Sequence, residues 1–196
     1  YQNVEIDEAS KLCKNKIAAG KNLPQWHEMY ARTLNLQRDG NARATAEIRK
    51  ALEAAPKDEN IIATAGYILA GSSPNAAGAV VPKIQDAIKS HPRNGRLHGA
   101  LAGCFDVMQN PHAEQEMITA IKLDPLDYDV NFQAVDHYSK LQKLDEVNNA
   151  YDRLIKGSPK SAYAWTERGV YRRDNYKFEQ SSQDLQKAVE LNPKYD

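Results

Sequence analysis

Apolar residues in the last part of the chain recur at helical spacing. Trp165 and Gly169 lie four residues apart, and Leu185, Ala188 and Val189 form a second stripe beyond a polar turn. Residues three or four apart share one face of a helix. The spacing therefore predicts two amphipathic helices that bury these five residues.

A proline stop follows the second helix and recurs upstream. From Pro56, the prolines at Pro92, Pro125, Pro159 and Pro193 follow at intervals of 36, 33, 34 and 34 residues. Proline lacks the N–H that a helix needs and disfavours helix in the residue before it. A period of about 34 residues with helical spacing inside each unit predicts an array of two-helix repeats.

The last unit resembles a known family. Five of its residues match the tetratricopeptide-repeat (TPR) pattern W-x2-L-G-x2-Y…A-x3-F…P, namely Trp165, Gly169, Leu185, Ala188 and Pro193. Arg168, Arg172 and Ser181 depart from the pattern, where leucine, tyrosine and alanine are usual. The resemblance covers roughly residues 24–196.

The resemblance implies an all-α fold, a right-handed superhelical α-solenoid of helix–turn–helix repeats. The sequence divides into an N-terminal segment and five repeats, with expected boundaries at 1–23, 24–58, 59–94, 95–127, 128–161 and 162–196. The N-terminal segment is expected to be a helix that caps the first repeat, or else half of an upstream repeat. Pro82 predicts an irregular start or a bend in the second helix of its repeat.

Three glycines of the third repeat fall on one helix face. Gly95, Gly99 and Gly103 recur every four residues and leave that face almost without side chains. Glycine inside a helix costs about 1 kcal/mol relative to alanine, so the arrangement needs a physical reason. Close packing by a neighbouring helix and contact with a ligand both stay open.

Composition narrows the classes of partner. Lysine plus arginine and aspartate plus glutamate number 26 each, so the formal net charge is zero. We expect no nucleic-acid partner, because such binding needs a large positive excess. No apolar run approaches the roughly 20 residues of a membrane-spanning helix, so no membrane insertion is expected. Cys13 and Cys104 are too few for a disulfide scaffold and are expected to be buried thiols.

Catalytic and cofactor motifs are missing from the sequence. It contains no G-x-S-x-G elbow, no phosphate-binding G-x4-G-K-[ST] loop and no H-E-x-x-H pair. We therefore expect a protein that is not an enzyme and that has no cofactor and no metal site. A cytoplasmic location is favoured, and export to the periplasm stays open because an upstream signal could have been removed.

The resemblance also indicates where a partner would bind. In TPR proteins the first helix of each repeat lines a concave groove, and the repeat phase places ten residues there: Arg32, Asn60, Tyr67, Arg96, Gly99, Gly103, Phe132, Asp136, Tyr163 and Arg173. Some family members bind acidic chaperone tails through a clamp of basic residues and asparagine. The matching positions here carry Ala63, Tyr67, Ala100, Asp129 and Gln133, so that activity is not expected.

These observations favour a protein-interaction scaffold that holds a peptide or a partner helix in its groove. The alternative is a structural module that self-associates through its terminal repeats. The second helix of the last repeat is expected to leave part of an apolar edge, near Leu185 and Val189, without a covering neighbour. We therefore expect that the natural chain continues past Asp196 or that this end packs against another copy.

Overall fold

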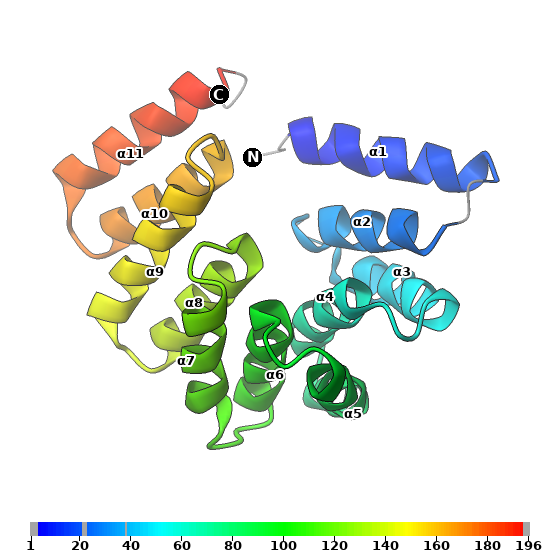
Figure 1. Cartoon of the computed structure of the whole chain (residues 1–196). Coiled ribbons are helices and arrows are strands. Elements are labelled where there is room, and N and C mark those ends of the chain that lie inside the picture. The colour runs from blue at the N-terminus through cyan, green and yellow to red at the C-terminus, as the bar shows by residue number, and fades with distance from the viewer. Residues whose placement is uncertain (1–3, 21–22, 38, 194–196) are drawn as a thin grey trace. The chain divides into compact units, whose positions relative to one another are not determined.

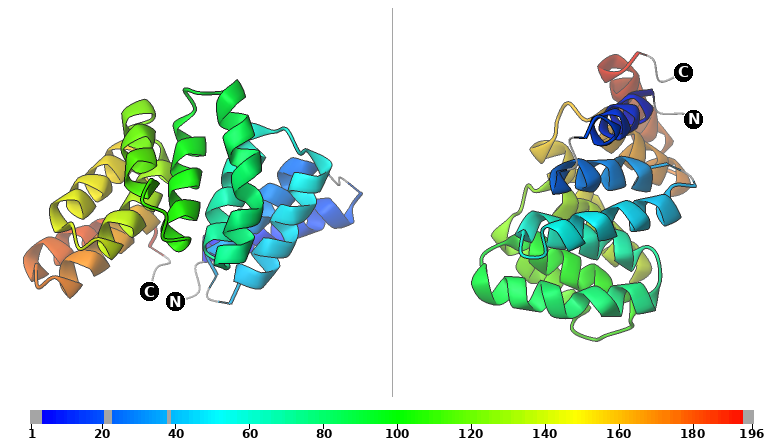
Figure 2. Two further views of the ribbon diagram at one scale, coloured as in Figure 1. Left: turned by 90° about the horizontal axis from the view of Figure 1, so that it is seen from below. Right: turned by 90° about the vertical axis from the view of Figure 1, so that its right-hand side faces the viewer.

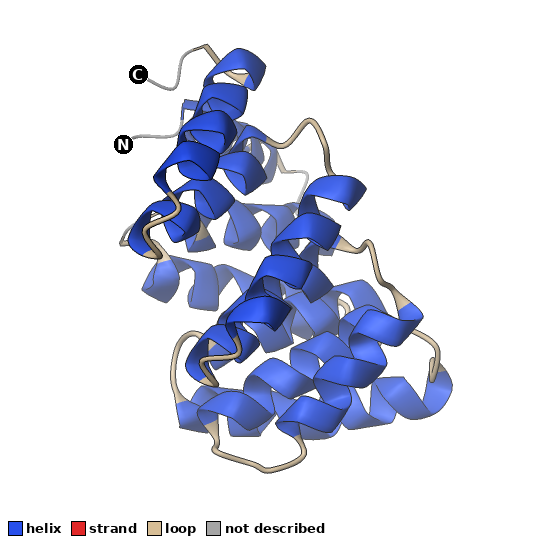
Figure 3. Ribbon diagram, turned by 90° about the vertical axis from the view of Figure 1, so that its left-hand side faces the viewer, coloured by secondary structure: helices blue, strands red, loops and turns tan. Residues whose placement is uncertain are grey.

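The structure is a computed structural model, and it describes residues 4–20, 23–37 and 39–193. This part of the chain contains eleven α-helices and no strand, with short loops between the helices (Figure 3). The helices are α1 (Val4–Ala18), α2 (Pro24–Asn35), α3 (Asn41–Ala54), α4 (Glu59–Ala70), α5 (Pro74–Ser90), α6 (Gly95–Val107), α7 (Ala113–Leu123), α8 (Tyr128–Lys140), α9 (Leu144–Gly157), α10 (Ala162–Asp174) and α11 (Phe178–Leu191).

The chain forms two compact units, which we call the N-terminal unit (Val4–Pro125) and the C-terminal unit (126–193). In the N-terminal unit α1 packs on α2, and the pairs α2–α3, α4–α5 and α6–α7 follow in order (Figures 1 and 2). The C-terminal unit contains the pairs α8–α9 and α10–α11. We refer to α2, α4, α6, α8 and α10 as the first helices. Helices that pack in consecutive pairs are the arrangement that the sequence period predicts.

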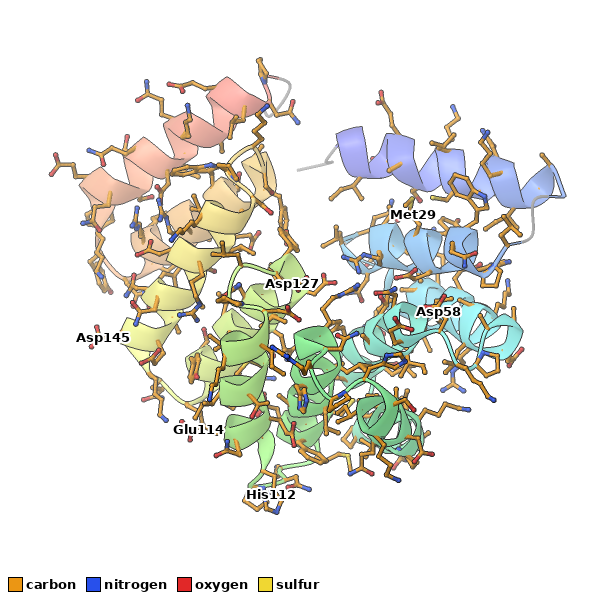
Figure 4. All side chains as sticks on the ribbon, in the orientation of Figure 1. Met29, Asp58, His112, Glu114, Asp127 and Asp145 are labelled. Atoms are coloured by element: carbon orange, nitrogen blue, oxygen red, sulfur yellow. The ribbon has the colours of Figure 1, made fainter. Side chains whose placement is uncertain are left out.

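The helix starts repeat with the same period as the prolines. Four first helices are preceded directly by an N-cap residue that lies two residues after a proline. These N-cap residues are Asp58, Asn94, Asp127 and Ser161. Each of these side chains accepts a hydrogen bond from a backbone N–H of the first turn, and Figure 4 shows Asp58 and Asp127 at the starts of α4 and α8. Such a cap stabilises a helix by about 1 kcal/mol. Proline and cap together set where each repeat begins.

Three first helices end in the same hydrogen-bonded turn. Gln109, Gln142 and Tyr176 have positive φ angles of 55°, 56° and 60°. Each donates its N–H to the carbonyl three residues back, and the next residue donates to the carbonyl five residues back. This is the Schellman arrangement, in which the left-handed position usually holds glycine because other residues are strained there. Each turn therefore places a residue other than glycine in the left-handed region, which costs conformational free energy.

Helix α5 corrects one of the two expectations for Pro82. An irregular helix start near Pro82 was expected, but α5 begins eight residues earlier, at Pro74, while the alternative of a bend near Pro82 stays a prediction. Ser73 caps it regularly by accepting from the N–H of Ala76, and the helix continues through Pro82 to Ser90. Residues 71–75, whose glycine, serine and proline are typical of a turn, are therefore helical from Pro74 onward.

Small residues let α4 and α6 pack closely in the N-terminal unit. A Cβ atom added to Gly66 would lie 2.7 Å from the Ala100 Cβ and 2.8 Å from the Ile84 Cδ1. The Cys104 thiol donates to the Gly66 carbonyl at 3.6 Å. Burial raises the pKa of Cys104 to about 12, so the group is a thiol rather than a thiolate. Cys104 and Cys13 are both buried and free, which confirms the expectation for the two cysteines.

The three glycines of α6 are buried. Gly95 has a clear packing reason, because a Cβ there would lie 2.8 Å from the Ala120 carbonyl oxygen of α7. Its N–H donates to the Asp124 carboxylate at 2.7 Å. Close helix packing therefore explains Gly95, while the roles of Gly99 and Gly103 stay predictions.

Candidate partner-binding surfaces

A hydrogen-bonded network joins the first helices α2, α4 and α6 of the N-terminal unit. At its centre is Thr64, whose side chain is 1% exposed and donates to the Glu28 carboxylate at 2.7 Å. The guanidinium groups of Arg32 and Arg96 donate to the same hydroxyl oxygen, each at 3.4 Å. A buried hydroxyl costs free energy unless it is hydrogen-bonded, so this position holds both arginines in place.

Two further contacts fix Arg96. Its guanidinium donates to the Asn60 side-chain oxygen at 3.0 Å, and its backbone carbonyl accepts from the Tyr67 hydroxyl at 2.8 Å. Asn60 is exposed, while Arg32, Tyr67 and Arg96 are half-buried. We call this set the arginine surface: Glu28, Arg32, Asn60, Thr64, Tyr67 and Arg96. With two arginines and one glutamate, it carries a formal charge of +1 within a polar network.

The first helices of the C-terminal unit present aromatic rings instead. Tyr128 stacks on Phe132 with ring centroids 6.1 Å apart, and Phe132 of α8 lies 6.1 Å from Tyr163 of α10. The Tyr163 side chain also hydrogen-bonds Glu167, four residues later on α10. We call this set the aromatic surface: Tyr128, Phe132, Tyr163 and Glu167. All four side chains are half-buried.

Glu167 is half-buried beside tyrosine side chains. Burial raises the pKa of its carboxyl group, and the hydrogen bond from Tyr163 lowers it only in part. On the α9 side, burial raises the pKa of Tyr151, and the charge of Glu167 raises it further. The Tyr151 ring packs 5.3 Å from Tyr171 of α10. A desolvated carboxylate among tyrosine rings is therefore built into this unit.

A buried ionic cluster lies elsewhere in the C-terminal unit, at the residues that depart from the TPR pattern. Arg168 is 9% exposed and donates to both oxygens of the Asp184 carboxylate, at 2.8 and 2.7 Å. Arg172 donates to the same carboxylate at 2.7 Å, and Arg168 also reaches Asp152 at 2.7 Å. The Arg168 guanidinium lies 4.9 Å from the ring centroid of Trp165. Asp184 and Asp152 thus compensate the charges of the two arginines that stand where leucine and tyrosine are usual.

The structure joins some of the predicted groove residues and separates others. Arg32, Asn60, Tyr67 and Arg96 belong to the arginine surface, and Phe132 and Tyr163 to the aromatic surface. Gly99 and Gly103 are buried in α6. The charges of Asp136 and Arg173 are taken up locally, by Lys140 at 2.6 Å and by Asp174 at 2.9 Å.

Sequence reasoning missed four members of these surfaces. Each lies four residues from a residue that was predicted: Glu28 from Arg32, Thr64 from Asn60, Tyr128 from Phe132 and Glu167 from Tyr163. A spacing of four residues places side chains on one helix face, so that signal was available. The groove positions were predicted from the repeat phase alone, so neighbours four residues away on the same face were not included.

Histidine and acidic side chains form pairs in the described residues, not larger clusters. His27 lies 2.6 Å from Glu47, and His98 lies 2.6 Å from Glu116. The hydrogen bond to Glu116 raises the pKa of His98. Within the ranges that the structure covers, no three such groups are arranged to hold a metal ion, and none of the helices is both long and apolar enough to cross a membrane.

Solved structures with the same arrangement of helices support the class of fold. YrrB, "a TPR protein with an unusual peptide-binding site", is 22% identical, with 95% of each chain covered and a TM-score of 0.50. A MamA protein is 15% identical, with 97% of this chain and 95% of its own covered and a TM-score of 0.53. Yeast Tom70 is 18% identical, with 97% of this chain but 40% of its own covered and a TM-score of 0.55.

No protein-family model and no curated protein sequence matches the chain. At these identities the structural likenesses establish the fold, which is that of an all-α repeat protein with helices packed in consecutive pairs. The fold is that of the tetratricopeptide-repeat proteins among these structures, in agreement with the resemblance of the sequence pattern.

Proposed function

We propose that the chain is a non-catalytic scaffold that binds a peptide or a partner helix across the first helices of its repeats. The observation that carries this proposal is the arginine surface, where one buried hydroxyl orients two arginines from different helices. Arginine and aromatic side chains supply much of the binding energy at protein interfaces. Side chains that are already held in place lose less entropy when a partner binds.

The aromatic surface adds a second contact region of different chemistry. Its rings come from two successive first helices, α8 and α10, so one extended segment could contact both. YrrB, a protein of this fold, is described as having a peptide-binding site, which makes a peptide a reasonable partner here. We propose a protein or peptide partner rather than a nucleic acid, in line with the zero net charge.

The test uses a random-peptide library displayed on phage and selected on the immobilised full chain. Affinities of a selected peptide are then measured for Arg96→Gln and Phe132→Ala, one variant on each surface. Each should weaken binding by about tenfold or more, the usual cost of removing a central contact. Arg49→Ala on α3 and Phe178→Ala on α11 are matched controls, because both side chains are exposed on second helices. Unchanged affinity in both surface variants would exclude these surfaces.

Self-association is the second candidate, and one observation favours it. Val189 on α11 is 45% exposed, although the apolar stripe of the sequence predicted it to be buried. Its neighbour Leu185 is half-buried and packs near Gly169, where an added Cβ would lie 2.9 Å from the leucine side chain. Light scattering over a concentration series, with Val189→Glu as the comparison, tests this candidate. A monomer at every concentration for both proteins would exclude it.

A further inference from the structure

Glu167 has a carboxylate without a cationic partner in the part of the chain that the structure describes. Its hydrogen-bond partner is the neutral side chain of Tyr163. The nearby arginines of α10 are committed elsewhere: Arg168 and Arg172 to Asp184, and Arg173 to Asp174. The ionised group is therefore half-buried without the charge compensation that Asp184 of the same unit receives.

The surroundings of Glu167 suit an organic cation. The rings of Phe132 on α8 and Tyr163 on α10 lie 6.1 Å apart, and Tyr163 hydrogen-bonds the Glu167 carboxylate. A lysine or arginine side chain combines a positive end, which a carboxylate accepts, with an aliphatic stem that packs on rings. Cations are also attracted to the faces of aromatic rings. A partly desolvated carboxylate beside such rings offers both interactions at one place.

We propose that the aromatic surface binds a lysine or arginine side chain of the partner, with Glu167 accepting its N–H groups and the rings of Phe132 and Tyr163 packing on its stem. This inference rests on the proposed function, because it assigns the chemistry of one position in the bound segment. The partner segment then carries a basic residue at the C-terminal unit. The arginine surface of the N-terminal unit offers no carboxylate of this kind, because Glu28 shares the Thr64 hydroxyl with the guanidinium groups of Arg32 and Arg96.

The first experiment compares peptide selections on the full chain and on Glu167→Gln. Glutamine has nearly the same size but no charge, so the rings and the backbone keep their places. Peptides selected on the unmodified chain should share a basic residue at one position. Selection on Glu167→Gln should lose that preference and keep the preferences at the other positions.

The second experiment is a double-mutant cycle with one selected peptide. Its basic residue, lysine for example, is replaced by norleucine, which keeps the stem and removes the charge. Each single change should weaken binding by about tenfold, as expected for a partly buried charge pair flanked by rings. Both changes together should weaken binding little more than one alone, because they remove the same interaction.

The outcomes separate this inference from the proposed function. If peptides bind without a basic preference, or if the two changes act independently, the lysine or arginine site is wrong while the scaffold proposal stands. If no peptide is enriched on the full chain, both are wrong. Circular dichroism controls for the fold of Glu167→Gln. Should that variant lose helicity, the norleucine peptide on the unmodified chain still decides, because unchanged affinity would overturn the inference.

Discussion

The two units use arginines on their first helices in opposite ways. In the N-terminal unit, Arg32 and Arg96 are half-buried and donate to the neutral hydroxyl of Thr64. In the C-terminal unit, Arg168 is 9% exposed and forms a bidentate ion pair with Asp184. The first arrangement keeps its arginines half-buried in a polar network, and the second buries Arg168 almost completely.

The difference shows that an arginine on a first helix does not by itself indicate a binding surface. What matters is the set of partners: Arg32 and Arg96 share the Thr64 hydroxyl with Glu28, whereas Arg168 binds the buried Asp184 carboxylate directly. In the C-terminal unit Arg168 and Arg172 form ion pairs with the buried Asp184. Its first helices present aromatic rings and Glu167 at the surface instead. The same repeat fold therefore supports two surfaces of different chemistry.

The largest expected effect comes from removing the carboxylate that neutralises the buried arginines. Asp184→Asn should destabilise the C-terminal unit by about 3–5 kcal/mol, because it leaves buried charge without compensation. Urea unfolding followed by fluorescence measures it. The chain has two tryptophans, Trp26 and Trp165, so a Trp26→Phe background makes Trp165 report on this unit alone.

The matched control for that change is Asp152→Asn. Asp152 also accepts from Arg168, but its side chain is 62% exposed. An exposed pair contributes about 1 kcal/mol or less, so this variant should unfold almost like the unmodified chain. Equal losses for the two variants would contradict the assignment of a buried structural role to Asp184.

A smaller effect is expected at the centre of the arginine surface. Thr64→Val keeps the shape of the side chain but removes the hydroxyl that Glu28, Arg32 and Arg96 share. The variant should lose about 1–3 kcal/mol of stability, the cost of leaving hydrogen-bonding groups unsatisfied. Urea unfolding in a Trp165→Phe background reports on the N-terminal unit through Trp26. Thr45→Val is the control, since its bond to Ser72 is exposed, and a greater loss there would contradict the role of Thr64.

A stabilising change is expected at the turn that ends α8. Gln142 has a φ of 56°, a conformation that glycine adopts without strain. Gln142→Gly should therefore stabilise the C-terminal unit by about 0.5–1 kcal/mol, after allowing for the greater freedom of glycine in the unfolded chain. Gln180→Gly, inside α11, should instead destabilise by about 1 kcal/mol. Thermal unfolding compares the two, and a loss of stability in Gln142→Gly would contradict the strained turn.

The smallest effect concerns the pH dependence of the aromatic surface. Because the pKa of Glu167 is raised in the folded state, ionisation favours unfolding, and stability falls as pH rises from the unfolded pKa through the folded pKa. Glu167→Gln removes this loss. Its stability relative to the unmodified chain should increase over that range and then level off at neutral pH. Urea midpoints at a series of acidic to neutral pH values measure it, and a constant difference would contradict the raised pKa.

Much of the fold could be predicted from the sequence because its signals are local. Pro56, Pro92, Pro125 and Pro159 each stand two residues before an N-cap, so the start of a first helix could be read from neighbouring residues. Val189 was expected both in the apolar stripe of α11 and at an apolar edge without a covering neighbour, and its exposure of 45% agrees with the second expectation only. Ala188, its neighbour in that stripe, is 2% exposed. Apolar character at helical spacing marks the edge of a stripe as well as its centre, and only packing distinguishes them.

The surfaces were harder to predict because their defining contacts cross between helices. Thr64 meets Glu28 across 36 residues of sequence, and Arg168 meets Asp184 across 16. No single helix reveals that Thr64 orients two arginines, or that Arg168 is neutralised and Glu167 is not. Residue type and repeat phase predict which helix face a side chain lies on. The contacts that it makes with other helices decide whether its charge is compensated and what its role is.

The most direct test of the account is to map the footprint of a selected peptide by two-dimensional ¹⁵N NMR on the full chain. We predict that the largest shifts of backbone amides upon binding fall on α2, α4 and α6 and on α8 and α10, around Thr64 and Tyr163. The amides of the second helices α3, α5, α7, α9 and α11 should shift little. A footprint centred on the second helices, with the first helices unchanged, would contradict binding at the arginine and aromatic surfaces.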